Sequence, residues 1–232
     1  MRKEESLHLY EEVMLLALKD EKGTVFAGTM YNYAIGGAIL AELLMEKRID
    51  VEAVKKRKYV RILNPAPLGD PLLDECLAKI AGAKRRAKIQ DWVTKLANMK
   101  RLKHRGAENL AKRGILRVDE DKVLGIFART IYPEVDPKPE RAMIERLRRA
   151  IFSEAGDVGS RTVVLLSLAS GADLLKLVFD KKEIKGRKAR IAQIVNSELT
   201  GKATKEAIEA VQAAIVMACV IPAVMVSTTA GH

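Results

Sequence analysis

Stripes of apolar residues at helical spacing recur along this 232-residue chain, and they limit its fold more than any other feature. Between Leu7 and Leu18, apolar side chains return with the period of an α-helix that buries one face. Further stripes fall in Tyr31–Lys47, Pro71–Ala81, Lys88–Ala97, His104–Arg113, Pro139–Ser153, Arg161–Phe179, Lys185–Leu199 and Lys205–Met225. The chain is therefore predicted to be mainly α-helical, as a single globular domain over residues 1–232.

Capping and turn residues predict where several helices begin, bend or touch. Asp70 is a natural N-cap for a helix that starts at Pro71, because a short acidic side chain accepts from free N–H groups of the first turn. Gly171 is expected to break the helix in which it lies. Gly36 and Gly37 each cost a helix interior about 1 kcal/mol relative to Ala, so they indicate the close approach of a packed helix.

Two β-hairpins interrupt the helical pattern. Lys58–Leu63 alternates weakly and precedes a proline-rich turn, which predicts a short strand. Ile115–Val118 and Val123–Ala128 flank the charged residues 119–122, which predicts an antiparallel hairpin whose turn is that charged segment.

The C-terminal part of the chain, from Ala210 to Gly231, carries no charged side chain. Such a run could be read as a membrane span or as a buried helix. Gln212 and Pro222 make a poor hydrocarbon segment. We therefore predict that Ala210–Val226 is buried in the protein rather than inserted in a bilayer.

The residue patterns of the common enzyme and metal sites are absent from the sequence. The three histidines and two cysteines are scattered, without the spacing of a zinc site, and no phosphate-binding glycine motif or nucleophile elbow occurs. The acidic pair Asp119 and Asp121 lies in an expected turn, where a solvated tip is the simpler interpretation. These observations predict a protein that is not an enzyme and that uses no cofactor and no metal ion.

The chain carries a net charge of +11, with a sequence pI near 9.6. The cations gather in three runs, at Lys55–Lys58 with Arg61, at Lys84–Lys88, and between Lys95 and Arg113. One such run is commonly a solvated face, but three runs in one chain favour a shared anionic partner. Composition alone leaves open whether that partner is a nucleic acid or a phosphate-rich membrane surface.

Six segments together resemble the Golgi phosphoprotein 3 family. In chain order they are LHLYEEVMLLALKDEKG (Leu7–Gly23), GAILAELLMEKRI (Gly37–Ile49), PAPLGDPLLDECL (Pro65–Leu77), IQDWV (Ile89–Val93), AENLAKRGIL (Ala107–Leu116) and LLSLASGADLLK (Leu165–Lys176). The resemblance implies a helical bundle ringed by amphipathic helices, with a protruding hairpin around Lys55–Leu63. It also implies a non-catalytic peripheral adaptor that binds phosphatidylinositol 4-phosphate on the cytosolic face of the Golgi and links glycosyltransferase tails to the coatomer.

The family's headgroup pocket uses a tryptophan and three arginines, and the resemblance carries these positions onto Ala27, Gly36, Lys100 and Lys103. Two lysines therefore replace an arginine pair, which keeps charge but loses the bidentate fork. Arg101 and Arg105 are expected to flank the site. Trp92 matches another family position and is expected in the core.

The basic hairpin residues are expected at the surface, because unpaired cations are costly to bury. They are Lys55, Lys56, Arg57, Lys58 and Arg61. A projecting strand edge can pair with another copy of the chain or with a client protein.

Two functions from different classes are thus left to compare. The first is a cytoplasmic, peripherally membrane-associated adaptor whose partners are anionic lipids and client proteins. The second is a winged-helix nucleic-acid binder, because a basic helix (His104–Arg113), Gly114 and a hairpin follow one another as recognition helix and wing do. The family resemblance favours the membrane adaptor and makes nucleic acid the weaker alternative.

Overall fold

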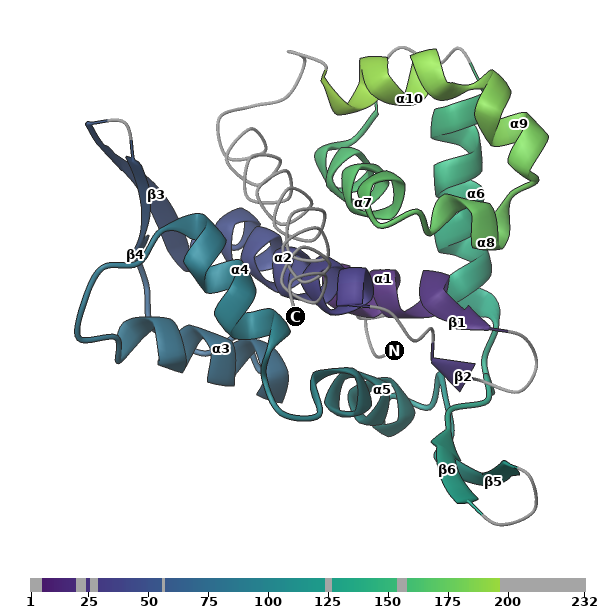
Figure 1. The fold of residues 1–232 in the computed structure, drawn as a ribbon, viewed down its shortest axis with the longest axis horizontal. Helices are drawn as coiled ribbons and strands as arrows, with labels where there is room; N and C mark the ends of the chain where they lie inside the picture. The colour runs from purple at the N-terminus through teal and green to yellow at the C-terminus, as the bar shows by residue number, and fades with distance from the viewer. Residues whose placement is uncertain are drawn as a thin grey trace, which may run out of the picture.

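The computed structural model describes residues 6–19, 24–25, 29–55, 57–123, 127–153 and 158–196 of the chain. Over these ranges the fold is mainly α-helical, as predicted, with three small antiparallel strand pairs (Figure 1). The helices are α1 (Leu9–Ala17), α2 (Thr29–Met45), α3 (Pro71–Ala81), α4 (Ile89–Ala97), α5 (Leu102–Lys112), α6 (Lys138–Phe152), α7 (Ser160–Gly171), α8 (Leu175–Val178), α9 (Lys181–Gly186) and α10 (Lys188–Val195).

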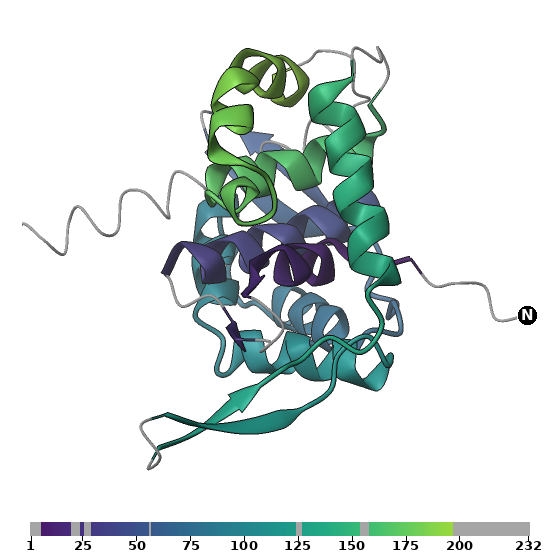
Figure 2. The ribbon, with the colours of Figure 1, turned by 90° about the vertical axis from the view of Figure 1, so that its right-hand side faces the viewer.

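The strands pair as three hairpin-like units along the chain. They are β1 (Leu18–Lys19) with β2 (Thr24–Val25), β3 (Ile49–Val54) with β4 (Arg57–Ile62), and β5 (Asp119–Val123) with β6 (Phe127–Ile131). The β3–β4 hairpin points away from the helices, and Figure 2 shows the β5–β6 hairpin extending from the lower end of the body.

The β5–β6 hairpin differs from its prediction. The charged residues 119–122 were expected to form the turn, but they lie in the first strand, so the expected strand boundaries are wrong. Cross-strand charge pairing explains the shift, because Asp121 lies opposite Arg129 and its Oδ2 accepts from Arg129 Nη2 at 2.6 Å.

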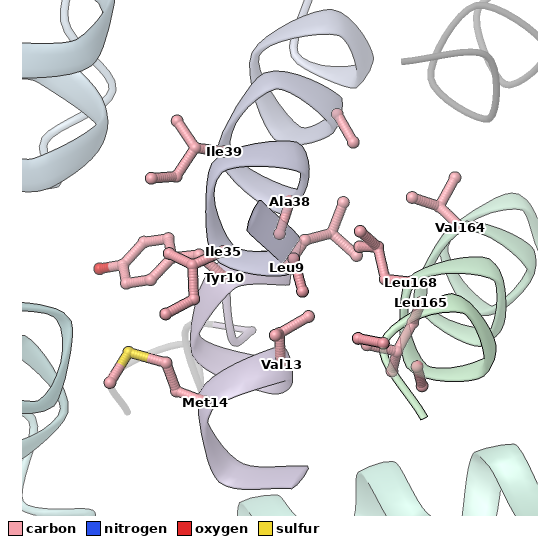
Figure 3. Packing of buried hydrophobic residues seen from close by; sticks show 14 of the residues in the cluster. Leu9, Tyr10, Val13, Met14, Ile35, Ala38, Ile39, Val164, Leu165 and Leu168 are labelled. Carbon is pink, nitrogen blue, oxygen red and sulfur yellow. The ribbon is translucent and has the colours of Figure 1, made fainter. Parts of the chain in front are cut away.

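Helices α1 and α2 form the centre of the core, and the other helices pack around them. Every residue of α1 is buried. Figure 3 shows that Leu9 of α1 and Ala38 of α2 face Leu168 of α7, whereas Tyr10 and Met14 point to the opposite side. The surrounding helices α3, α4 and α6 each bury one apolar face and expose a polar one. This is the central bundle ringed by amphipathic helices that the family resemblance implies.

Local capping places α3 where the sequence predicts it. The Asp70 carboxylate accepts from the N–H groups of Leu72 and Leu73 at 3.0 and 2.8 Å, and Pro71 is the first helical residue. The same carboxylate accepts from Tyr10 Oη at 2.7 Å, which ties the start of α3 to α1. Gly171 is the last residue of α7, so the predicted helix break is confirmed.

Two glycines allow helices to touch closely. A Cβ on Gly36 of α2 would lie 3.0 Å from the Val93 carbonyl oxygen of α4, which confirms the close helix approach predicted from the sequence. A Cβ on Gly106 of α5 would lie only 2.3 Å from Sδ of the buried Met14 in α1. The packing of α5 against α1 therefore requires the absence of a side chain at Gly106.

A buried ion network joins the first two helices to the rest of the bundle. It consists of Glu11, Glu12 and Glu42 with Arg113, Arg146 and Arg161. The three glutamates are at most 2% exposed. Arg161 donates to both oxygens of Glu42, at 3.1 and 3.0 Å, and Arg146 donates to Glu12 at 2.5 Å. Each acid thus has a partner from a later helix or its end, which fixes how these elements pack.

Burial and pairing act in opposite directions on these acids. Burial raises the pKa of Glu12 above its usual value although two arginines oppose the rise. Burial acts in the same sense on Glu42, but hydrogen bonds and charge from His8 and Arg161 outweigh it, so the Glu42 pKa is lowered.

The prediction for Ala210–Val226 falls outside the described residues, as do Lys56 and Ala27. No helix among the described ranges has both the length and the apolar character needed to cross a membrane.

Candidate anion-binding site

The helix that carries the predicted anion-binding lysines begins earlier than expected. Helix α5 starts at Leu102 rather than His104, after Arg101, whose φ of 56° lies in the left-handed region. Lys100 is therefore in the turn before α5, and Lys103 is in its first turn. The two lysines therefore do not share one helical face, because the left-handed residue between them redirects the chain.

A hollow of about 570 Å³ opens between α3, α4 and the start of α5, and Lys100 lies on its wall. We call it the basic hollow. Its lining residues are Glu75, Lys79, Ala83, Trp92, Lys95, Leu96, Asn98, Met99, Lys100 and Arg105. Four cations and one carboxylate face the same space, so the basic hollow has a surplus of three positive charges.

The basic hollow contains only part of the predicted site. It brings together Lys100 and Arg105 from the predicted set, whereas Arg101 and Lys103 are not among its lining residues. It also contains Lys95, from the same basic run, and Lys79 of α3, which sequence reasoning missed. Lys79 stands alone in sequence, so no run of charge pointed to it.

An ion pair occupies one side of the basic hollow. Arg105 donates to Glu75 Oε2, and Lys79 Nζ lies 3.5 Å from Glu75 Oε1. The side chains of Arg105, Glu75 and Lys79 are 30%, 39% and 50% exposed. The hydrogen bond from Arg105, aided by the charge of Lys79, lowers the Glu75 pKa below its usual value.

Trp92 forms part of the hollow and also belongs to the core. Trp92 is only 4% exposed, which confirms the predicted burial. Lys95 Nζ lies 4.5 Å from the centre of the Trp92 ring, a cation–π contact that restrains this ammonium group beside the opening.

The cations outside the basic hollow have different surroundings. Arg101 Nη2 donates to Glu108 Oε1 at 2.9 Å, so its charge is paired within the same stretch of chain.

His104 Nδ1 lies 2.8 Å from Tyr132 Oη. Burial, followed by the charges of Arg101 and Lys103, lowers the His104 pKa, so this imidazole is neutral at pH 7.

The position carried over from the family's early arginine offers no space for a ligand. A Cβ added to Gly36 would lie 3.1 Å from the amide nitrogen of Ala97, in addition to its contact with the Val93 carbonyl oxygen. No pocket therefore opens at Gly36, because the backbone of α4 fills that space.

The basic hairpin is anchored at its base and exposed at its tip. Val60 is buried, and its N–H donates to the Ala87 carbonyl at 3.1 Å. Arg61 is held by Asp50, with Nη2 2.6 Å from Oδ2. Lys55, Arg57 and Lys58 are exposed near the tip, and Lys55 adopts a left-handed φ of 56° there.

Two observations on the described residues concern catalytic chemistry. Cys76 is buried, and burial raises the pKa of its thiol to about 12, so it is protonated at neutral pH. No group of three His, Cys, Asp or Glu side chains in the described part of the chain is arranged to hold a metal ion.

Comparison with known proteins adds a family match. A family model described as Golgi phosphoprotein 3 (GPP34) matches residues 9–211. The chain is also similar to the vacuolar protein sorting-associated protein 74 of Eremothecium gossypii, at 25% identity over 217 residues. That match covers 80% of this chain and 65% of the relative, so the chain spans about two thirds of that relative's length.

Proposed function

The chain belongs to the Golgi phosphoprotein 3 family, and from that premise we propose that it is a peripheral membrane adaptor without catalytic activity. In this proposal the basic hollow binds phosphate-bearing lipid headgroups, of which phosphatidylinositol 4-phosphate is the family-type ligand. In the same proposal the protein lies in the cytoplasm at an anionic membrane surface. In a eukaryotic cell that surface is the cytosolic face of the Golgi.

The observation that carries this proposal is the charge surplus of the basic hollow. Each Lys or Arg close to an anionic surface contributes about 1 kcal/mol, so the hollow and its neighbour Lys103 together supply a salt-sensitive attachment of several kcal/mol. Most of these cations are lysines, which bind phosphate as point charges. Headgroup selection therefore depends on the amount of charge more than on stereochemistry.

The nucleic-acid alternative receives less support. A recognition helix needs a basic exposed face, but Arg105 and Arg113 of the α5 region are paired with Glu75 and Glu11. Lys112 is the one exposed cation within α5, whereas Lys103 and Arg105 are half-buried. The helix therefore offers few charges to a DNA duplex.

Vesicle co-sedimentation with a matched pair of variants tests the headgroup site. Phosphatidylcholine vesicles containing phosphatidylinositol 4-phosphate are compared with phosphatidylcholine alone across a salt series, with duplex DNA as competitor. Lys95→Glu with Lys100→Glu should reduce binding at least tenfold, since two cations become anions at about 1 kcal/mol per charge. Thermal stability should change by less than about 1 kcal/mol, because both side chains are exposed.

The control changes the same charge elsewhere, as Lys84→Glu with Arg85→Glu. Both residues are exposed and lie outside the hollow lining, whereas Arg86 is paired with Glu52. Equal loss in the two double variants would mean that binding is diffuse. Binding to DNA with a steep salt dependence, and no vesicle pelleting, would favour the nucleic-acid function.

We also propose that the β3–β4 hairpin tip contacts another copy of the chain or a client protein. Among the described residues β3 and β4 form a two-stranded sheet, and the residues near its basic tip are exposed, which supports this role. Replacing residues 53–58 with an Asn-Gly turn should weaken self-association in sedimentation velocity and leave folding intact. Removing all of Lys55–Leu63 is a poorer test, because that deletion takes the buried Val60 as well.

A further inference from the structure

Glu75 stands where an incoming anion would need to bind. It is the one carboxylate among the residues that line the basic hollow. It contacts two of the four cations, Arg105 through a hydrogen bond and Lys79 at 3.5 Å. A phosphate that enters the hollow must therefore share these cations with Glu75 or displace it.

The exposure of this ion pair makes displacement inexpensive. Glu75 is 39% exposed, whereas the side chains of Glu12 and Glu42 in the buried ion network are 3% exposed. Opening the buried network would leave charges unpaired away from water. When Arg105 changes partner in the hollow, the Glu75 carboxylate remains beside solvent and keeps its i,i+4 neighbour Lys79.

Building on the proposed function, we propose that Glu75 is an internal competitor that selects phosphate monoesters over singly charged headgroups. A monoester dianion carries more charge than the Glu75 carboxylate and takes Arg105 from it. A phosphodiester or carboxylate carries a single charge at each group, which equals that of Glu75 and gives no advantage in the exchange. The remaining cations, Lys95 and Lys100, attract either kind of headgroup.

Two single variants with the same change in charge test this selection. Glu75→Gln removes the competitor, and Glu108→Gln is the matched control. Glu108 has a side chain that is 37% exposed, close to that of Glu75, and it pairs with Arg101 at 2.9 Å outside the hollow lining. Each variant and the unmodified protein are titrated with vesicles containing either phosphatidylinositol 4-phosphate or phosphatidylserine. Fluorescence of Trp92, the single tryptophan, reports occupancy of the hollow itself.

Glu75→Gln should strengthen binding to phosphatidylserine vesicles about 25-fold, because it removes one unit charge near the surface and also makes Arg105 available to this lipid, at about fivefold for each effect. Its binding to phosphatidylinositol 4-phosphate vesicles should rise only about fivefold, because the monoester takes Arg105 in either protein and gains only from the removed charge. Glu108→Gln, whose charge lies outside the hollow, should change binding to either lipid by less than about twofold. The selectivity for the monoester should thus fall several fold in Glu75→Gln alone.

Other outcomes overturn the inference in recognisable ways. Equal gains in both variants would mean that only net charge matters, and weaker binding by Glu75→Gln would mean that Glu75 positions Arg105 for the ligand. If the unmodified protein binds the monoester vesicles with a Trp92 signal but Glu75→Gln keeps full selectivity, the proposed function stands and the inference fails. If neither lipid moves the Trp92 signal in any protein, both fail together.

Discussion

The buried ion network and the basic hollow are both built from arginines or lysines that meet glutamates, yet their surroundings differ. In the network, three arginines meet three glutamates, and the carboxylates are almost fully buried. In the hollow, four cations face one carboxylate at an open surface. Balanced buried charge fixes the packing of helices, whereas surplus exposed charge remains available to a ligand. Burial and balance therefore separate the charges that hold the helices together from the charges that we propose bind a ligand.

The largest expected effect comes from unbalancing the network. Arg161→Met leaves Glu42 and Glu12 buried without their shared partner, which should lower the free energy of unfolding by about 3–5 kcal/mol in urea denaturation. Adding Glu42→Gln to this variant should recover part of the loss, because it removes one uncompensated charge. A change below about 1 kcal/mol in the single variant would show that solvent reaches these acids and that the network is not structural.

A smaller effect is expected at the helix that contributes to both regions. Arg105 near the start of α5 faces the hollow, and Arg113 just after its end pairs with Glu11 of the network. Gly106→Ala would place a Cβ 2.3 Å from Met14 Sδ and push α5 away from α1. We expect a loss of about 1–3 kcal/mol in the free energy of unfolding.

Gly186→Ala is the matched control for this glycine, because Gly186 also lies in a helix and has nothing within 4 Å of an added Cβ. Its backbone is not left-handed, so the control should change the free energy of unfolding little. If the free energy of unfolding of Gly106→Ala is unchanged, Met14 repacks freely and α5 is not held tightly between the two regions.

Local signals in the sequence predict the fold well where they act alone. Asp70 and Pro71 determine the first residue of α3, and Gly171 ends α7, because caps and breaks depend on immediate neighbours. The start of α5 was missed because Arg101 adopts a left-handed conformation that residue type does not signal. The β5–β6 turn was misplaced because its strand depends on cross-strand charge pairs.

The basic hollow could be predicted only in part for a similar reason. Lys95, Lys100 and Arg105 belong to one basic run, so the sequence indicates them together. Glu75 and Lys79 join them only when α3 packs beside α4 and α5, and the contact of Glu75 with Arg105 spans thirty residues. A count of charges along the chain therefore gives the sign of the site but misses the carboxylate inside it.

The smallest expected effect is the pH dependence of binding to phosphatidylinositol 4-phosphate vesicles. The second proton of a phosphate monoester leaves near pH 6, so ligand charge grows and binding should strengthen severalfold between pH 5 and pH 7. The lowered Glu75 pKa keeps this carboxyl ionised over that range, and its contribution to stability is lost only as the pH falls through the lowered value. The lowered His104 pKa limits the positive charge that this neighbouring imidazole gains on acidification. Co-sedimentation at constant ionic strength should therefore show a steeper rise for the unmodified protein than for Glu75→Gln, because the singly charged monoester at pH 5 has no advantage over the Glu75 carboxylate and the dianion at pH 7 has one. Equal slopes would mean that Glu75 does not compete with the headgroup. A flatter rise in the unmodified protein would mean that the Glu75 carboxyl loses its charge between pH 7 and pH 5, and that the hollow does not hold it in the ionised form on which the contrast with the buried network depends.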